Sequence, residues 1–315
     1  MYATILVPLD GSPFGELALP VAARLAEAHG AALHLAAVHG PGPMLLPLVT
    51  EDAPMLDAAA DRTRRDEMQA YLERTADRLR EAGHRVTVGL LAGEPVGVAV
   101  ADEAAARGAG LIVLTTHGRG GLSRVWLGSV TTDLLRHART PLLVVRAHEP
   151  HDRGADAGEP TTAAAWRGPR HVLVPVDGSA FALRAVDVAR TLGEPFGARL
   201  TLLRVVPTAA AFLPYDATFW TAAEAEAIET QRTLALRETE DAVARLRGDG
   251  LTADGLVVVA PDPARAILHA AAEQRVDTVA MSTHARGGAA RLLLGSVTDK
   301  VIRASELPVL VVRPT

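Results

Sequence analysis

A block of sequence that occurs twice constrains this chain more than any other feature. The first copy runs from Thr115 to Arg146 and the second from Ser282 to Arg313. Each copy leaves an apolar segment, crosses a glycine-rich loop and reaches Gly-Ser. It then continues through a helix-like stretch and a proline to a short apolar strand. The repeat is far longer than the repeating unit of a solenoid, so it predicts two copies of one domain.

The duplication extends over most of the chain. Corresponding residues are offset by 167 positions, as Asp177 is from Asp10 and Val205 from Val38. The offset changes by one near Pro95 and Pro263 and then recovers, which predicts small compensating insertions. The segment between the copies is rich in Gly, Pro, Ala and charge, as linkers are. We therefore expect domains at 1–146 and 170–315, joined by a linker at 147–169.

Each half alternates apolar strands with amphipathic helices. In the first half, apolar runs at 5–9, 32–38, 86–90, 111–114 and 142–145 are separated by helix-like stretches. Strands that are apolar on both faces are typical of parallel sheets covered on both sides. The sequence predicts an α/β protein with two tandem, open, parallel, five-stranded sheets that carry helices on both faces.

Composition excludes several classes of function. The 315-residue chain is 49% hydrophobic, so each half can bury a core. A net charge of -5 and 3% aromatic residues argue against a nucleic-acid-binding protein. The absence of cysteine rules out disulfides and thiolate metal sites. The N-terminus reads as a strand, no apolar run reaches membrane-spanning length, and we expect a cytoplasmic protein without a membrane partner.

The chemistry is expected beyond the carboxyl ends of the strands, where open parallel sheets bind ligands. Asp10 follows the first strand, and a glycine-rich loop from Thr115 to Gly121 follows the fourth. Glycines allow the backbone to approach a phosphate, and the helix that opens at Gly128-Ser129 offers amide donors. The plainer alternative is a tight strand-to-helix connection with a capping serine. Neither GxxxxGK[ST] nor a GxGxxG after the first strand is present.

The spacing Thr115-x2-Gly118-x9-Gly128-Ser129 resembles the G-x2-G-x9-G-[ST] nucleotide motif of the universal stress protein family. The resemblance covers nearly the whole chain apart from the linker. It implies an adenine nucleotide alpha hydrolase-like fold and ATP as ligand, with or without Mg²⁺. In ATP-binding members, the aspartate after the first strand and the valine ending the second contact the nucleoside. The loop and the Gly-Ser hold the phosphates.

Carried onto this sequence, the resemblance and the loop chemistry give two candidate ATP sites and no catalytic or metal-ligating residue. The first comprises Pro8, Asp10, Ser12, Val38, Gly93, Thr115, His117, Gly118, Arg119, Gly121, Gly128, Ser129 and Val130. The second comprises Pro175, Asp177, Ser179, Val205, Ser282, His284, Arg286, Gly288, Gly295, Ser296 and Val297.

The second site departs further from the family motif. The first motif glycine is Thr115 in one half and Ser282 in the other, both small residues. The next motif glycine is Ala285 in the second half, and Pro261 replaces the glycine of the Gly93 turn. Alanine is penalised where a positive φ or a close phosphate approach is needed. We therefore expect the first site to be competent and the second to be weaker.

Several candidate residues have structural alternatives. Ser12 and Ser179 are well placed to cap a helix, and no paired base supports a nucleophilic role. Asp10 and Asp177 are as well suited to brace the following turn as to contact a ligand. His117 lies beside the candidate phosphate loop, but no other ligand pattern accompanies it. The sequence thus leaves open at most a slow ATPase.

The last strands imply an assembly. In the family that this chain resembles, the terminal strand pairs antiparallel with that of a partner domain, so 142–146 is expected to pair with 309–313 as an intramolecular pseudo-dimer. A further homodimer stays open. The leading hypothesis is an ATP-binding protein that senses adenine nucleotide in a stress response. The alternatives are a scaffold that binds no nucleotide and acts through protein partners, and, more weakly, a hydrolase or transferase with a nucleotide substrate.

Overall fold

The computed structural model describes residues 1–40, 53–115, 127–146, 166–208, 222–283 and 295–313. The elements of the first half are β1 (Thr4–Pro8), α1 (Pro13–Glu16), α2 (Leu19–His29), β2 (Ala32–His39), α3 (Ala53–Glu81), β3 (Val86–Ala92), α4 (Val96–Ala106), β4 (Leu111–Thr115), α5 (Ser129–His137) and β5 (Leu142–Val145). Those of the second half are β6 (His171–Val176), α6 (Ala180–Gly193), the 3₁₀-helix η2 (Glu194–Phe196), β7 (Arg199–Pro207), α7 (Ala222–Gly248), β8 (Ala253–Ala260), α8 (Pro263–Glu273), β9 (Thr278–Ser282), α9 (Ser296–Ala304) and β10 (Val309–Val312).

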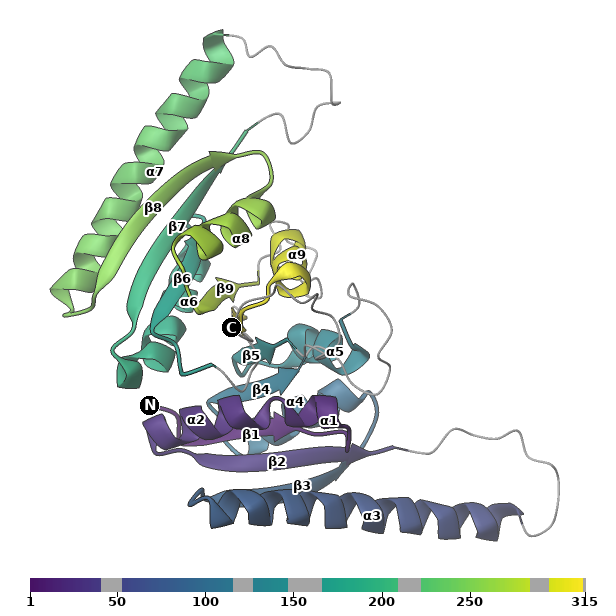
Figure 1. Cartoon of the computed structure of the whole chain (residues 1–315). Helices are drawn as coiled ribbons and strands as arrows, with labels where there is room; N and C mark the ends of the chain where they lie inside the picture. Colours follow the sequence, from purple (N-terminus) through teal and green to yellow (C-terminus); the bar gives the residue numbers. More distant parts are fainter. Residues whose placement is uncertain (41–52, 116–126, 147–165, 209–221, 284–294, 314–315) are drawn as a thin grey trace, which may run out of the picture.

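The strands form one continuous sheet of 10 strands in the order β3-β2-β1-β4-β5-β10-β9-β6-β7-β8 (Figure 1). Neighbouring strands within each half are parallel, while β5 and β10 pair antiparallel, with Leu143 opposite Leu310. The predicted fold class is confirmed, including the pairing through the last strands. That pairing covers two strand edges that would otherwise be open.

Each face of the sheet carries its own layer of helices and its own core. Alternation along β1 sends Ile5 and Val7 to one core and Leu6 to the other. The first core packs against α2, α3, α6 and α7, and the second against α4, α5, α8 and α9. Both cores contain residues of both halves, so the two domains share their interior.

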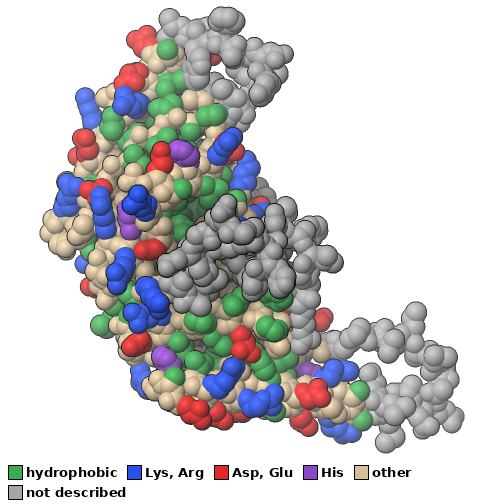
Figure 2. Space-filling model, viewed as in Figure 1, with side chains coloured by type: hydrophobic (Ala, Val, Ile, Leu, Met, Phe, Trp, Pro, Cys, Tyr) green, Lys and Arg blue, Asp and Glu red, His purple; other side chains and the backbone are tan. Residues whose placement is uncertain are grey.

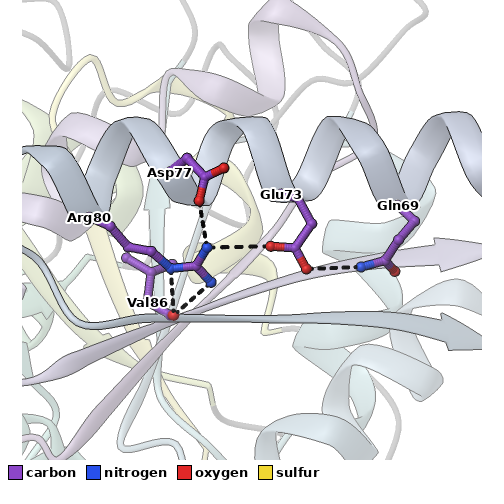
Figure 3. A network of polar contacts seen from close by, with 5 residues as sticks. All are labelled: Gln69, Glu73, Asp77, Arg80 and Val86. Carbon is purple, nitrogen blue, oxygen red and sulfur yellow. Dashed lines mark hydrogen bonds and ion pairs between the residues drawn. The ribbon is translucent and has the colours of Figure 1, made fainter.

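The long helices α3 and α7 lie along the outer strands of the sheet (Figure 1). On α3, Arg80 donates through Nε and Nη2 to the carbonyl of Val86, at 3.3 and 3.1 Å. The same guanidinium donates to Asp77 at 2.7 Å and to Glu73 at 3.4 Å. Gln69 in turn donates to Glu73, which extends the chain of contacts along α3 (Figure 3). The helix is thereby fixed to the first residue of β3.

The second half repeats this anchor. Arg247 of α7 donates from Nε to the carbonyl of Ala253, the first residue of β8, at 2.8 Å, and contacts Asp254 at 3.1 Å. Both arginines lie six residues before the carbonyl that accepts their bond. The anchor is therefore a property of the duplicated unit.

The register between the halves corrects one sequence-based expectation. Helices α4 and α8 correspond at an offset of 167 at both ends, from Val96 to Pro263 and from Ala106 to Glu273. The expected slip near the two prolines is therefore wrong. Pro95 precedes its helix as the N-cap, whereas Pro263 is the first residue of α8, with Asp262 as N-cap. Proline is tolerated at both positions, so aligning prolines gave a false insertion.

Contacts besides the sheet join the halves. Arg146 Nη1 donates to the carbonyl of Ser305 at 3.2 Å, just beyond α9. Reciprocally, the Arg313 guanidinium donates to the carbonyl of Arg136 near the end of α5. A cation at a helix C-terminus interacts favourably with the helix dipole. Each domain therefore contacts the last helix of the other.

Among the described residues, no helix is both long enough and apolar enough to cross a membrane. On the face seen in Figure 2, acidic and basic side chains are interspersed over both halves.

Candidate functional site

A cavity of about 270 Å³ lies beyond the carboxyl ends of β1, β2 and β4 in the first half. Its volume is close to the lower end of the range for small-molecule pockets, about 300 Å³. Its walls are mainly apolar, with a few polar groups. The lining residues are Pro8, Leu9, Asp10, Gly15, Ala36, Val38, Val96, Val100, Leu114, Thr115, Gly128, Ser129, Val130 and Thr131.

The turn after β1 presents the only acidic side chain of this lining. Asp10 Oδ1 accepts bonds from the amide of Ser12 at 2.9 Å and from its hydroxyl at 2.6 Å. Ser12 Oγ in turn accepts from the amide of Gly15 at 3.1 Å, as the N-cap of α1. Ser12 is therefore a buried cap that orients Asp10, and it does not line the cavity. Asp10 both braces the turn and faces the cavity.

Gly15 allows this arrangement because it has no side chain. A Cβ at this position would lie 2.8 Å from Asp10 Oδ1, closer than unbonded atoms approach. Glycine contributes space at this position rather than an unusual backbone conformation, since its φ does not lie in the left-handed region. The position of the Asp10 carboxylate thus depends on two neighbours, Ser12 and Gly15.

The N-terminus of α5 closes another side of the cavity. The helix begins at Ser129, and the N-cap position is Gly128, which has no side chain to accept a bond from the first amides. The interpretation of Ser129 as the cap is therefore wrong. Thr131 Oγ1 donates to the carbonyl of Thr115 at 3.3 Å, which ties the first turn of α5 to the end of β4. Amide groups at such a terminus carry positive partial charge and favour anions.

The structure brings most of the described candidate residues of the first site together. Seven line the cavity: Pro8, Asp10, Val38, Thr115, Gly128, Ser129 and Val130. Gly93, in the turn before α4 with a φ of 139°, is not part of this lining. His117, Gly118, Arg119 and Gly121 lie outside the described residues.

Sequence reasoning missed seven other lining residues: Leu9, Gly15, Ala36, Val96, Val100, Leu114 and Thr131. The periodicity of strands and helices could have indicated some of them. Ala36 lies two residues before Val38 on a strand and shares its face, and Val100 follows Val96 by one helical turn. No pattern pointed to Gly15, because its role depends on a distance between two segments.

The second half places its candidate residues in the same order. Asp177 Oδ1 accepts from the amide of Ser179 at 3.0 Å, and Ser179 Oγ accepts from the amide of Ala182 at 3.2 Å. Gly295 is the N-cap of α9, and Ser296 is its first residue. Pro175, Val205, Ser282 and Val297 occupy the positions of their first-half counterparts on β6, β7, β9 and α9. His284, Arg286 and Gly288 lie outside the described residues, as does Ala285.

The two turns nevertheless differ in their surroundings. Ala182 stands where the first half has Gly15, so a Cβ occupies the space beside the aspartate turn. Arg204 replaces Ala37, and its guanidinium lies next to Gly178 and 3.8 Å from Glu238. The second turn is thus packed against charged side chains that the first turn lacks. The expected replacement of Gly93 by Pro261 is wrong, because Ala260 is the counterpart at the observed offset of 167.

The family model of the Universal stress protein family matches residues 1–146 and 168–313. The chain belongs to this family. A universal stress protein from Mycolicibacterium smegmatis is 30% identical over 312 residues, covering 98% of this chain and 97% of the relative. Universal stress protein Rv2623 of Mycobacterium tuberculosis is 27% identical over 318 residues, covering 98% and 96%.

Solved universal stress proteins share the fold over the full chain. A crystal structure from Archaeoglobus fulgidus has a TM-score of 0.66 and 19% identity, covering 98% of this chain and 96% of the other. A putative universal stress protein from Pseudomonas aeruginosa has a TM-score of 0.63 and 19% identity, covering 99% and 94%. The tandem arrangement of two universal stress protein domains thus occurs in sequence relatives and in solved structures.

Proposed function

We propose that the first half of this universal stress protein binds an adenine nucleotide, ATP, and that the bound nucleotide regulates the protein's action in a stress response. The observation that carries the proposal is the cavity that runs from apolar strand ends to the N-terminus of α5. An apolar compartment suits a purine base, and exposed amides at a helix N-terminus suit a phosphate chain. The described side chains leave this space open.

Individual residues have distinct parts in the proposal. Val38 and Val100 would contact the base, and Asp10 would accept a hydrogen bond from the ribose or the base. The amides at Ser129 and Val130 would bind phosphate oxygens. The described residues contain no group of three metal-binding side chains, so a Mg²⁺ ion would be held chiefly by the phosphates, as is usual for this ion. The protein's own part is binding and orientation, and no residue is assigned to catalysis.

Equilibrium binding of ATP to the full chain, followed by isothermal titration calorimetry, tests this proposal. Val38→Phe fills the cavity and is expected to weaken ATP binding by at least roughly tenfold, or about 1.4 kcal/mol. Val205→Phe places the same change at the corresponding position of the second half and is the matched control. It is expected to leave the affinity of the first site unchanged.

Three results would contradict the proposal. The first is no saturable binding of ATP to the wild-type chain at millimolar concentration, which would favour a scaffold that binds no nucleotide. The second is ATP binding by Val38→Phe as tight as that by the wild type. The third is loss of binding in Val205→Phe alone, which would place the nucleotide in the second half.

A further inference from the structure

Gly97 lies at a close contact between α4 and α5, two helices that both line the cavity. A Cβ at this position would lie 2.4 Å from the Cβ of Asp133 and 3.0 Å from both Leu134 N and Val130 O. Because unbonded carbon atoms do not approach to 2.4 Å, α4 contacts the backbone of α5 directly here. Gly97 has no positive φ, so its backbone conformation does not require glycine. The close contact is thus the physical reason for a glycine.

The contact lies at the functional end of both helices. Val96 and Val100 of α4 line the cavity, as do Ser129 and Val130 of α5. Gly97 packs against the carbonyl oxygen of Val130, in the first turn of α5. Together with the bond from Thr131 to β4, this contact gives the N-terminus of α5 two points of attachment.

The second half lacks this close approach. At the observed offset of 167, Ala264 takes the place of Gly97 and is 3% exposed, so α8 and α9 accommodate a Cβ. Lys300 takes the place of Asp133 and pairs with Asp262 at 3.5 Å. Direct backbone contact of these two helices is therefore a feature of the first half, not of the duplicated unit.

We infer that Gly97 is a positioning residue that sets where the amides at the N-terminus of α5 lie relative to the cavity. This inference rests on the proposed nucleotide function of the same site. A methyl group at Gly97 forces α4 and α5 apart, and the first turn of α5 is the part in contact. Binding of the ligand's anionic end is therefore weakened most. The nucleoside end is affected less, because its contacts lie on β1, β2 and β4 apart from Val100 of α4.

The test compares ATP with adenosine. Gly97→Ala is expected to weaken ATP binding by at least roughly tenfold and to change adenosine binding by less than about twofold, as measured by calorimetry on the full chain. A loss of protein stability alone would weaken the binding of ATP and of adenosine to the same extent. The ratio of the two affinities therefore separates positioning from general destabilisation.

Gly110→Ala provides the matched control. A Cβ at Gly110 would lie 2.7 Å from Tyr2 Cδ1, which is a similar overlap at the amino end of β4, away from the cavity. This variant is expected to lower the melting temperature and leave the ratio unchanged. If Gly97→Ala does not fold, Asp133→Val adds a branched side chain at the same contact and is expected to change the ratio in the same direction.

The outcomes separate the two proposals. If the wild type binds no ATP, the proposed function fails. If the wild type binds ATP and folded Gly97→Ala or Asp133→Val retains the wild-type ratio, the positioning role of Gly97 is overturned while the proposed function stands. A change of the ratio in Gly110→Ala equal to that in Gly97→Ala would also overturn it.

Discussion

The residues that shape the candidate site act in pairs across short distances. Asp10 is oriented by Ser12 through two hydrogen bonds, and Gly15 leaves room for the carboxylate that accepts them. The second half has the aspartate and the serine but carries Ala182 in place of the glycine. Both turns have the sequence Asp-Gly-Ser, so they differ in what surrounds them, including the methyl group of Ala182 and the guanidinium of Arg204 in the second half.

Gly15→Ala tests the importance of this space. We expect it to push the Asp10 carboxylate away and to destabilise the protein by about 1–3 kcal/mol, as overpacking does. We also expect weaker ATP binding, since the displaced carboxylate faces the cavity. Chemical denaturation and calorimetry measure the two effects. Ala182→Gly is the reciprocal control, and an unchanged stability and affinity in Gly15→Ala would refute the argument.

His34 is expected to make the stability of the folded protein depend on pH. Burial lowers its pKa below the usual 6.5, the positive charge of Arg107 lowers it further, and Glu103 opposes both effects. The fully buried ring contacts Thr87 Oγ1 at 2.8 Å and Glu103 Oε1 at 2.9 Å. The unfolded chain therefore takes up a proton on His34 more readily than the folded chain. Its contribution to stability is present above pH 6.5 and is lost as the pH falls from there toward the lowered pKa.

Urea denaturation of the wild type and of His34→Gln between pH 7.5 and 5 tests this prediction. His29 and His171 also have pKa values lowered mainly by burial, so part of the pH dependence will remain in the variant. We expect a smaller fall in the free energy of unfolding for His34→Gln than for the wild type. Equal falls in the two proteins would show that His34 does not contribute.

At the scale of elements, the outer helices depend on one arginine each. Arg80 and Arg247 donate to the first carbonyl of the neighbouring strand, which ties a long helix to the edge of the sheet. We expect Arg80→Ala to increase amide hydrogen exchange in the C-terminal half of α3 and in β3, and to leave α7 unchanged. Arg247→Ala should show the converse pattern in α7 and β8.

Lysine offers a sharper comparison at this anchor. Arg80→Lys keeps the charge but cannot donate two bonds to one carbonyl while also contacting Asp77. The amide hydrogens of α3 and β3 should therefore exchange nearly as fast in Arg80→Lys as in Arg80→Ala. Full protection in the lysine variant would mean that charge alone anchors α3.

At the scale of the whole molecule, the two domains share a sheet and both cores. Leu310 and Leu143 face each other in the antiparallel pair of β10 and β5, and neither is exposed to solvent. Leu310→Ala is expected to cost about 2–5 kcal/mol, as other buried leucine truncations do. Because the cores are continuous, both halves should unfold in one transition at a lower temperature. Calorimetry showing that only the second half melts earlier would contradict a shared core.

Much of the architecture was predictable from the sequence. Apolar runs at regular intervals predicted the strands, and the duplicated block predicted two copies. Since parallel strands end at a common edge, the same reasoning placed Asp10 and Thr115 at one crevice, and the family resemblance added Val38. The antiparallel pairing of the last strands came from the family resemblance.

Only the tertiary structure determined the distances between helices and strands. Residue periodicity reports which face of a helix or strand is buried, but not how closely two backbones approach. It therefore could not reveal the direct contact of α4 with α5 at Gly97, the space beside Asp10 at Gly15, or the packing of the Arg204 guanidinium beside Gly178. Each depends on side-chain volume at a point where segments distant in sequence meet. The sequence alone thus determined which edge of each half carries the candidate residues, and close packing in three dimensions made their surroundings different.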